Sequence, residues 1–323
     1  MALYYVSFPL LPPVRTHFVV NCALVFLMLV VVALRLYLRV STKQGLGWDD
    51  ALVMFSAPHG VGMLVIQGLW LPMGIGYPIS ETMANIPLIL KLLLAYEVIY
   101  AVAITLIKLS MLCFYLRLFV NRSMRIATKA TIAFVVIWST ANILQIFLIC
   151  RPFSKTYDPT VTEGSCGDQV GSFIALGASN AVTDMAILLL PMSTVLGLKV
   201  AAKTKAALVG VFAVGLLTVV VAILRILSLT SVDLGGDLTG TMVYADFLST
   251  TEPNLGIICV SLPLLGPLFS WVHRRKGSSA RAGKDTRNTP RSGVRRFKGS
   301  GKSFDSFVRL EDLSRSDTAL RLS

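Results

Sequence analysis

The chain has 323 residues, of which 54% are hydrophobic and only 15% are charged. Together with a mean hydropathy of +0.71, this composition excludes an ordinary soluble domain, whose apolar stripes alternate with polar faces, and favours a membrane protein. The net charge is +13, and most of the excess follows residue 271, where 14 Lys and Arg face 5 Asp and Glu.

Seven apolar runs of about twenty residues are long enough, at a rise of 1.5 Å per residue, to cross a bilayer as helices. In chain order they occupy residues 18–38, 50–72, 92–116, 127–149, 172–195, 206–228 and 248–271. The sequence therefore predicts an all-α membrane protein. Its seven-helix transmembrane bundle covers residues 18–271, after an extracellular segment at 1–17.

The basic residues of the short loops predict the orientation, because Lys and Arg favour the cytoplasmic side. One side collects ten of them and the other side only four. The ten are Arg35, Arg39, Lys43, Arg117, Arg122, Arg125, Lys129, Lys199, Lys203 and Lys205. We therefore expect the amino terminus outside and the tail in the cytoplasm, most naturally at the plasma membrane.

The loop before the second span reads "GLGWDDAL". Asp49 and Asp50 stand at a helix amino terminus, which favours negative charge and capping oxygens. Trp48 suits the interfacial belt of a membrane protein. We interpret this stretch as a helix cap with a membrane anchor.

Besides Arg35, Asp50 and Lys129 near the inner ends of their spans, five charged residues lie inside the predicted spans, where each would cost about 2.5–3.5 kcal/mol or more if it faced lipid at the bilayer centre. They are Glu97, Lys108, Asp184, Arg225 and Glu252. Lys108 and Asp184 both lie near the predicted midplane, so we expect them to form a buried ion pair. Glu97, Arg225 and Glu252 lie near the outer ends of their spans, which predicts a second, outer cluster.

Two neutral polar residues belong with these charges. Asn180 lies one helical turn before Asp184 and places an amide beside that carboxylate. His59 lies in the second span at a depth similar to that of Lys108, and we interpret it mainly as a hydrogen-bonded core residue. For the midplane pair two hypotheses stay open, because it would either fix helix packing or line a pathway for a ligand or ion.

Two cysteines mark the second outer loop. Cys150 and Cys166 enclose the stretch "CRPFSKTYDPTVTEGSC" in an oxidising setting, which predicts a loop-closing disulfide. Two free thiols are the alternative.

The tail at 272–323 is basic, rich in Gly and Ser, and poor in apolar residues, so we expect disorder. Juxtamembrane basic clusters bind anionic inner-leaflet lipids, although a solvated flank explains the same charges. We expect no nucleic-acid partner. The sequence has no P-loop, metal-ligand spacing or Ser/His/Asp grouping in its aqueous segments, so we expect neither an enzyme nor a metal site.

Several motifs occur in the order typical of one fungal family. They include "GWDD" at 47–50, with Trp48, Asp49 and Asp50, "KLSMLCFYLRLF" at 108–119, "NAVTDMAILLLPMSTVLGL" at 180–198 and "TEPNLGIICVSLPLLGPL" at 251–268. This set resembles the fungal rhodopsin domain family, which includes membrane proteins of the satratoxin-cluster type and is similar to surface-sensing receptors. The resemblance implies a seven-helix membrane protein.

The word rhodopsin does not imply a pigment here. Microbial retinal pigments use a lysine in the seventh helix, and residues 248–271 contain none, so we expect no retinal and no other cofactor. We expect a receptor-like protein that senses an extracellular small molecule or surface cue and signals to a cytoplasmic partner. The alternatives are a transporter or accessory membrane component of a secondary-metabolite pathway, or a scaffold whose tail recruits partners.

Overall fold

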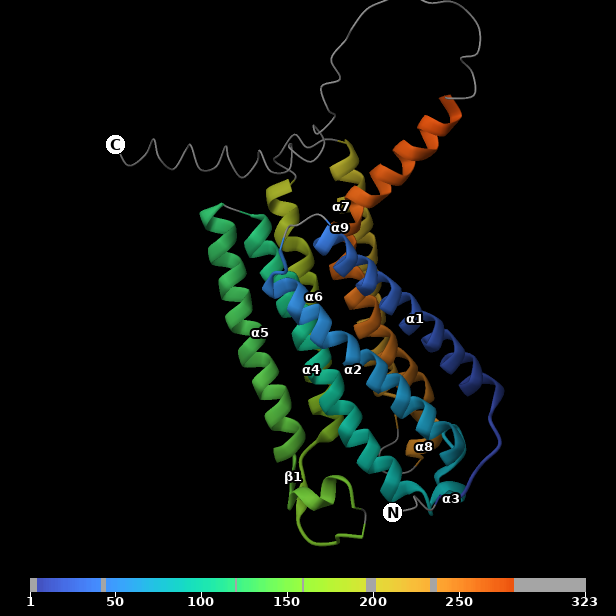
Figure 1. Cartoon of the computed structure of the whole chain (residues 1–323). Coiled ribbons are helices and arrows are strands. Elements are labelled where there is room, and N and C mark those ends of the chain that lie inside the picture. The colour runs from blue at the N-terminus through green and yellow to red at the C-terminus, as the bar shows by residue number, and fades with distance from the viewer. Residues whose placement is uncertain are drawn as a thin grey trace, which may run out of the picture.

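The computed structural model describes residues 5–41, 45–119, 121–158, 160–195, 202–232 and 237–281, with the side chains of 193–195, 202–208 and 264–281 left out. Within this part of the chain, seven long helices run back and forth as one bundle (Figure 1). They are α1 (Pro12–Ser41), α2 (Trp48–Trp70), α4 (Ile86–Leu118), α5 (Arg122–Leu148), α6 (Gln169–Val195), α7 (Ala202–Leu229) and α9 (Val243–Arg281).

Short elements connect these helices at one end of the bundle, the lower end in Figure 1. They are η1 (Leu71–Met73), α3 (Ile79–Thr82), β1 (Cys150–Arg151), η2 (Phe153–Thr156), β2 (Ser165–Cys166) and α8 (Leu238–Thr241). β1 and β2 pair antiparallel with Cys150 opposite Cys166, and the two cysteines form a disulfide. We therefore call this end the disulfide end. We call the opposite end, where α1 and α4 finish and α2 begins, the arginine end.

Six of the seven long helices are long and apolar enough to cross a membrane. The predicted seventh span, 248–271, lies within α9, whose side chains are described only as far as Pro263. At its far end α9 continues to Arg281, so residues 272–281 form helix where the sequence predicted disorder. The remainder of the predicted tail, 282–323, lies outside the described residues.

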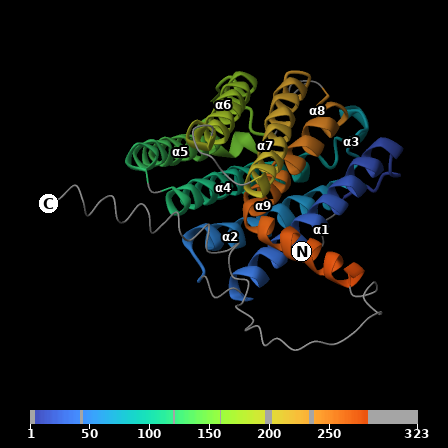
Figure 2. The ribbon, with the colours of Figure 1, turned by 90° about the horizontal axis from the view of Figure 1, so that it is seen from above.

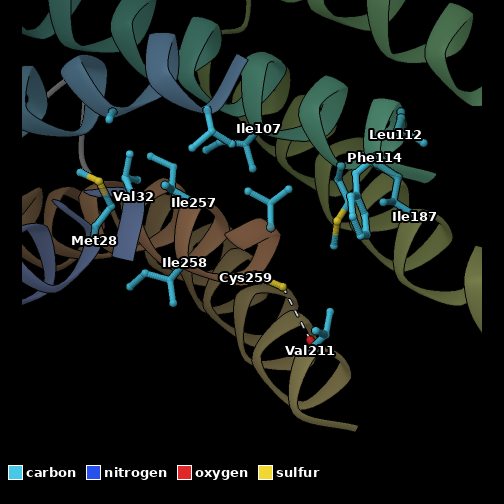
Figure 3. Close-up of a cluster of buried hydrophobic side chains, with 14 of the residues drawn as sticks. Met28, Val32, Ile107, Leu112, Phe114, Ile187, Val211, Ile257, Ile258 and Cys259 are labelled. Carbon is cyan, nitrogen blue, oxygen red and sulfur yellow. Dashed lines mark hydrogen bonds between the residues drawn. The ribbon is translucent and has the colours of Figure 1, made fainter. Parts of the chain in front are cut away.

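α9 is the central helix of the bundle, because it packs against α1, α2, α4 and α7 (Figure 2). A cluster of buried apolar side chains fills the space between these helices and α6 (Figure 3). Met28, Leu112 and Ile257 are fully buried in it, and the Cys259 thiol donates to the backbone carbonyl of Val211 on α7.

Polarity is distributed as it is in a membrane protein. Large apolar side chains such as Phe26, Ile137 and Val182 are exposed on the outer surface of the bundle. Arg35 and Asp50, by contrast, are completely buried. Since lipid solvates apolar groups and cannot solvate charges, an apolar exterior around a charged interior fits a bilayer. The structure is therefore an all-α membrane bundle.

Candidate functional site

Lys108 on α4 pairs with Asp184 on α6. The lysine Nζ lies 3.1 Å from Asp184 Oδ1 and donates to the backbone carbonyl of Asn180 at 3.0 Å. The same ammonium lies 4.8 Å from the centroid of the Trp138 ring, which adds a cation–π contact. Lys108 is therefore buried among three groups that each stabilise its positive charge.

Arg225 on α7 pairs with Glu252 on α9, closer to the disulfide end. Arg225 Nε lies 2.7 Å from Glu252 Oε2, and the Tyr100 hydroxyl donates to the same oxygen at 2.9 Å. The guanidinium carbon lies 4.8 Å from the centroid of the Tyr100 ring. Tyr100 therefore supports both members of this pair.

Asn180 joins the two ion pairs. Its Nδ2 donates to Glu252 Oε1 at 2.6 Å and to Asp184 Oδ2 at 3.5 Å. Depth along the helices predicts a midplane pair and a separate outer cluster. In the structure the Asn180 amide, one turn from Asp184, connects the two groups by hydrogen bonds to Asp184 and Glu252. We call the resulting set the cavity network: Lys108, Asp184, Asn180, Glu252, Arg225 and Tyr100.

Glu97 was predicted to join Arg225 and Glu252, and that pairing is wrong. Within the described part of the chain its half-buried carboxyl group makes no hydrogen bond or ion pair. Tyr100, which is three residues nearer the arginine end on the same helix, takes the contacts with both charges. Glu97 instead lines a cavity.

His59 lies outside the cavity network. Its Nδ1 is 2.8 Å from the backbone carbonyl of Phe55, one turn earlier on α2. The buried face of α2 passes through Ser56, Gly60 and Met63, and His59 falls beside that face. The hydrogen bond expected of His59 is therefore present, but the residue is only partly buried, because depth along a span does not fix the rotation of a helix about its axis.

A cavity of about 140 Å³ lies between α4, α5, α6, α7 and α9, in the half of the bundle next to the disulfide end. Its aromatic lining residues are Trp70, Tyr96, Tyr100, Trp138 and Phe173. Its polar lining residues are Glu97, Asn142, Asn180, Arg225, Asp246 and Ser249. Tyr100, Asn180 and Arg225 of the cavity network line this cavity, so a ligand would contact the Arg225 guanidinium directly.

Three side chains of this lining carry a buried polar atom without a hydrogen-bond partner among the described residues. The atoms are Asn180 Oδ1, Asp246 Oδ1 and Trp70 Nε1. Buried polar atoms in native proteins are paired in the great majority of cases. Three unpaired atoms around one cavity therefore favour a site that accepts polar groups from a bound molecule.

A second buried group of charges, at the arginine end, was missed as a cluster. Arg35 and Arg39 of α1 bridge Asp49 and Asp50 of α2 through four ion pairs of 2.8 to 3.0 Å. Arg117 of α4 lies 3.4 Å from Asp49 Oδ1. We call these five residues the arginine cluster.

Further hydrogen bonds connect the arginine cluster to the bundle. Arg35 Nη1 donates to the backbone carbonyl of Val260 on α9 at 2.7 Å, and Ser110 Oγ of α4 donates to the Asp49 carbonyl at 2.7 Å. The expected cap is present, since Asp50 Oδ2 accepts from the Gly47 N–H at 3.1 Å, and Trp48 is 82% exposed as an anchor would be.

The sequence nevertheless contained a signal for this cluster. Arg35 and Arg39 are four residues apart and share one face of α1, close in the chain to two adjacent carboxylates. They were counted only as loop charges that set the orientation.

The disulfide between Cys150 and Cys166 is present and closes the loop at the disulfide end. Cys22, Cys113 and Cys259 are free thiols within the helices.

Buried ion pairs inside an apolar exterior, on helices long enough to cross a bilayer, define a multi-pass integral membrane protein. The family model of the fungal rhodopsin domain matches residues 34–271, and the chain belongs to this family.

Among curated proteins, the chain is similar to "Polyenoic acids biosynthesis gene cluster protein Ba17b" of Metarhizium anisopliae, with 26% identity over 76% of this chain and 71% of the relative. It is similar to "Satratoxin biosynthesis SC1 cluster protein 4" of Stachybotrys chartarum, with 25% identity over 63% of this chain and 79% of the relative. A "SAT4 family membrane protein" of Emericella nidulans is 28% identical over 55% of this chain and 46% of the relative. No solved structure matches the chain.

Proposed function

We propose that this protein is a receptor-like membrane protein that binds a small organic molecule in the cavity between α4, α6, α7 and α9. The observation that carries this proposal is the cavity itself, which has an aromatic lining, unpaired polar atoms and a charged network in its wall. Mostly apolar pockets with a few convergent polar groups are the usual form of small-molecule sites. No catalytic role is part of the proposal.

α9 offers a physical route from the cavity to the opposite end of the bundle. Glu252 of the cavity network and the Val260 carbonyl that binds Arg35 both belong to this helix. They are eight residues apart, or about 12 Å along the helix axis. A ligand that changes the Arg225–Glu252 contact would move α9. That movement would change the hydrogen bond between the Val260 carbonyl and Arg35 of the arginine cluster.

In the proposed orientation, the disulfide end faces outward at the plasma membrane and the arginine end faces the cytoplasm. The excess of Lys and Arg in the loops of the arginine end supports this orientation. The basic segment at 282–323 would then lie beside anionic inner-leaflet lipids, and signalling partners would meet the arginine end.

Tryptophan fluorescence tests the binding proposal, because Trp70 and Trp138 both line the cavity. The full chain in lipid nanodiscs would be titrated with a panel of small organic molecules of different charge. We expect a saturable fluorescence change for at least one of them, and a weaker change in the folded fraction of Glu252→Gln, because Glu252 positions the lining residues Arg225 and Asn180. The same titration curve in wild type and Glu252→Gln would contradict binding at this site.

A second candidate is supported by the names of the relatives, several of which are proteins of biosynthesis clusters. In that case the protein would act as a transporter or accessory component of a secondary-metabolite pathway, with Lys108 and Asp184 as a relay at the midplane. Flux into proteoliposomes that disappears in Lys108→Met would favour this candidate. Folded protein that binds a ligand without any flux would favour the receptor.

A further inference from the structure

The ionisable side chains that line the cavity are predominantly acidic. Its lining includes the carboxyl groups of Glu97 and Asp246, whereas Arg225 is its one cationic residue among the described residues. Arg225 is already neutralised, because Glu252 pairs with it at 2.7 Å. A second anion beside Arg225 would have to compete with Glu252 and approach two further carboxyl groups.

The unpaired atoms of the lining are mostly hydrogen-bond acceptors. Asp246 Oδ2 accepts from Gln67 Nε2 at 2.8 Å, which leaves Oδ1 without a partner. The Asn180 side chain, 1% exposed, gives its Nδ2 to Glu252 and so keeps its Oδ1 as a free acceptor. Glu97 adds two carboxyl oxygens. Trp70 Nε1 is the one unpaired donor in this part of the described structure.

The aromatic lining also favours positive charge, because ring faces attract cations. Two of these rings already hold a protein cation, since Lys108 lies over Trp138 and Arg225 over Tyr100. The Trp70 and Tyr96 rings lie 5.2 Å apart, and no protein cation lies over either of them among the described residues.

We propose that the cavity selects an organic cation, an ammonium group attached to an apolar body about the size of one aromatic ring. The inference rests on the proposed function, that the cavity is a ligand site. Glu97 accepts a hydrogen bond from the ammonium beside the Trp70 and Tyr96 rings, the free acceptors of Asp246 and Asn180 favour positive charge from elsewhere in the lining, and the apolar body packs against Phe173. The size follows from the volume, because an apolar cavity of about 150 Å³ accommodates benzene.

The test compares three probes of one shape and different charge. Benzylammonium, benzyl alcohol and benzoate would be titrated into the wild-type chain in nanodiscs, with tryptophan fluorescence and the thermal midpoint as readouts. We expect benzylammonium to bind at least about tenfold more tightly than benzyl alcohol, and benzoate to bind least. This comparison needs no variant, so it stands even if a substitution prevents folding.

A matched pair of variants locates the effect. Glu97→Gln should weaken benzylammonium binding at least about tenfold while it leaves benzyl alcohol binding unchanged, because only the charged contact is removed. Glu163→Gln, in the exposed loop between β1 and β2, is the control and should change neither.

The outcomes separate this inference from the proposed function. Equal or tighter binding of benzyl alcohol or benzoate would overturn selection for a cation and leave the cavity as a ligand site. Selection for benzylammonium that Glu97→Gln does not reduce would also overturn the inference as drawn. No binding of any of the three probes would overturn both proposals together.

Discussion

The arginine cluster and the cavity network are alike in charge and unlike in their surroundings. Each contains two deeply buried cations that face two carboxylates. In the arginine cluster, Asp49 by itself contacts three arginines, Arg35, Arg39 and Arg117. The cluster lies between α1, α2 and α4, and a backbone carbonyl of α9 accepts a hydrogen bond from it. The cavity network borders an open space, with unpaired atoms at Asn180 and Asp246.

This difference separates a structural role from a binding role. A buried polar network whose groups are all paired makes one arrangement rigid, whereas a partly paired network beside a cavity retains capacity for new contacts. We therefore expect the arginine cluster to serve helix packing alone, and the cavity network to support both packing and the proposed ligand site. Four predictions test this division, from the largest expected effect to the smallest.

Replacing Arg35 with Met should destabilise the protein most. It leaves Asp49 and Asp50 buried with less positive charge and removes the donor to the Val260 carbonyl. Loss of one partner from such a buried group costs about 3–5 kcal/mol. Thermal unfolding of the detergent-purified chain measures this loss. Arg122→Met, exposed at the start of α5, is the control, and an equal midpoint for the two variants would refute a structural role.

Lys108→Met should cost somewhat less, about 2–4 kcal/mol, because the side chain of its partner Asp184 is 20% exposed and water screens part of the stranded charge. The double variant Lys108→Met/Asp184→Leu should recover stability to within about 1 kcal/mol of wild type, since no buried charge is left unpaired. The thermal midpoints of the single and double variants test this. A double variant that is less stable than the single one would show that each residue has separate essential contacts.

The same isosteric substitution at two glutamates should give different results. Glu252→Gln weakens contacts with Arg225, Tyr100 and Asn180 and should cost about 2–3 kcal/mol. Glu97→Gln removes no such contact and should change stability by less than about 0.5 kcal/mol. Parallel thermal melts of both variants make the comparison. A large loss in Glu97→Gln would mean that this carboxyl group supports the fold.

Gly47→Ala, beside the arginine cluster, should destabilise the protein less than the substitutions of Arg35, Lys108 and Glu252. A Cβ at this position would overlap Asp49 Oδ1 and lie 2.7 Å from Arg117 Nη1, so the cluster must shift at a cost of about 1–2 kcal/mol. Gly210→Ala, whose Cβ meets nothing within 4 Å, is the matched control and should be neutral or slightly stabilising. Indistinguishable thermal midpoints would show that the cluster tolerates the displacement.

Hydropathy was sufficient to predict the helices, because apolar runs of bilayer length have few alternatives. Even α2, with Pro58 and His59 in its middle, forms one helix of 23 residues. Depth along the spans was also sufficient to match Lys108 with Asp184, since only opposite charges at a similar level can meet.

Sequence could not predict how each helix is rotated against its neighbours, because side-chain packing determines that rotation. Glu97 therefore lies at the expected depth and makes none of the expected contacts, whereas His59 makes a hydrogen bond but lies beside the buried face of α2. Asn180 was recognised only as a neighbour of Asp184, since its bond to Glu252 requires α6 and α9 to be placed together. The packing of the side chains determines which buried polar atoms around the cavity lack a hydrogen-bond partner, and the sequence does not specify that packing.

The position of Glu252 on α9, the last long helix in the described part of the chain, has a consequence for biosynthesis. As the chain leaves the ribosome, Arg225 is synthesised before the carboxylate that neutralises it, and Arg35 before the Val260 carbonyl that receives one of its hydrogen bonds. A nascent chain that ends before α9 therefore lacks the carboxylate that neutralises Arg225, and an unpaired guanidinium is costly inside a bilayer. Insertion of α9 supplies the partners of both arginines, so we expect the bundle to gain much of its stability at that step.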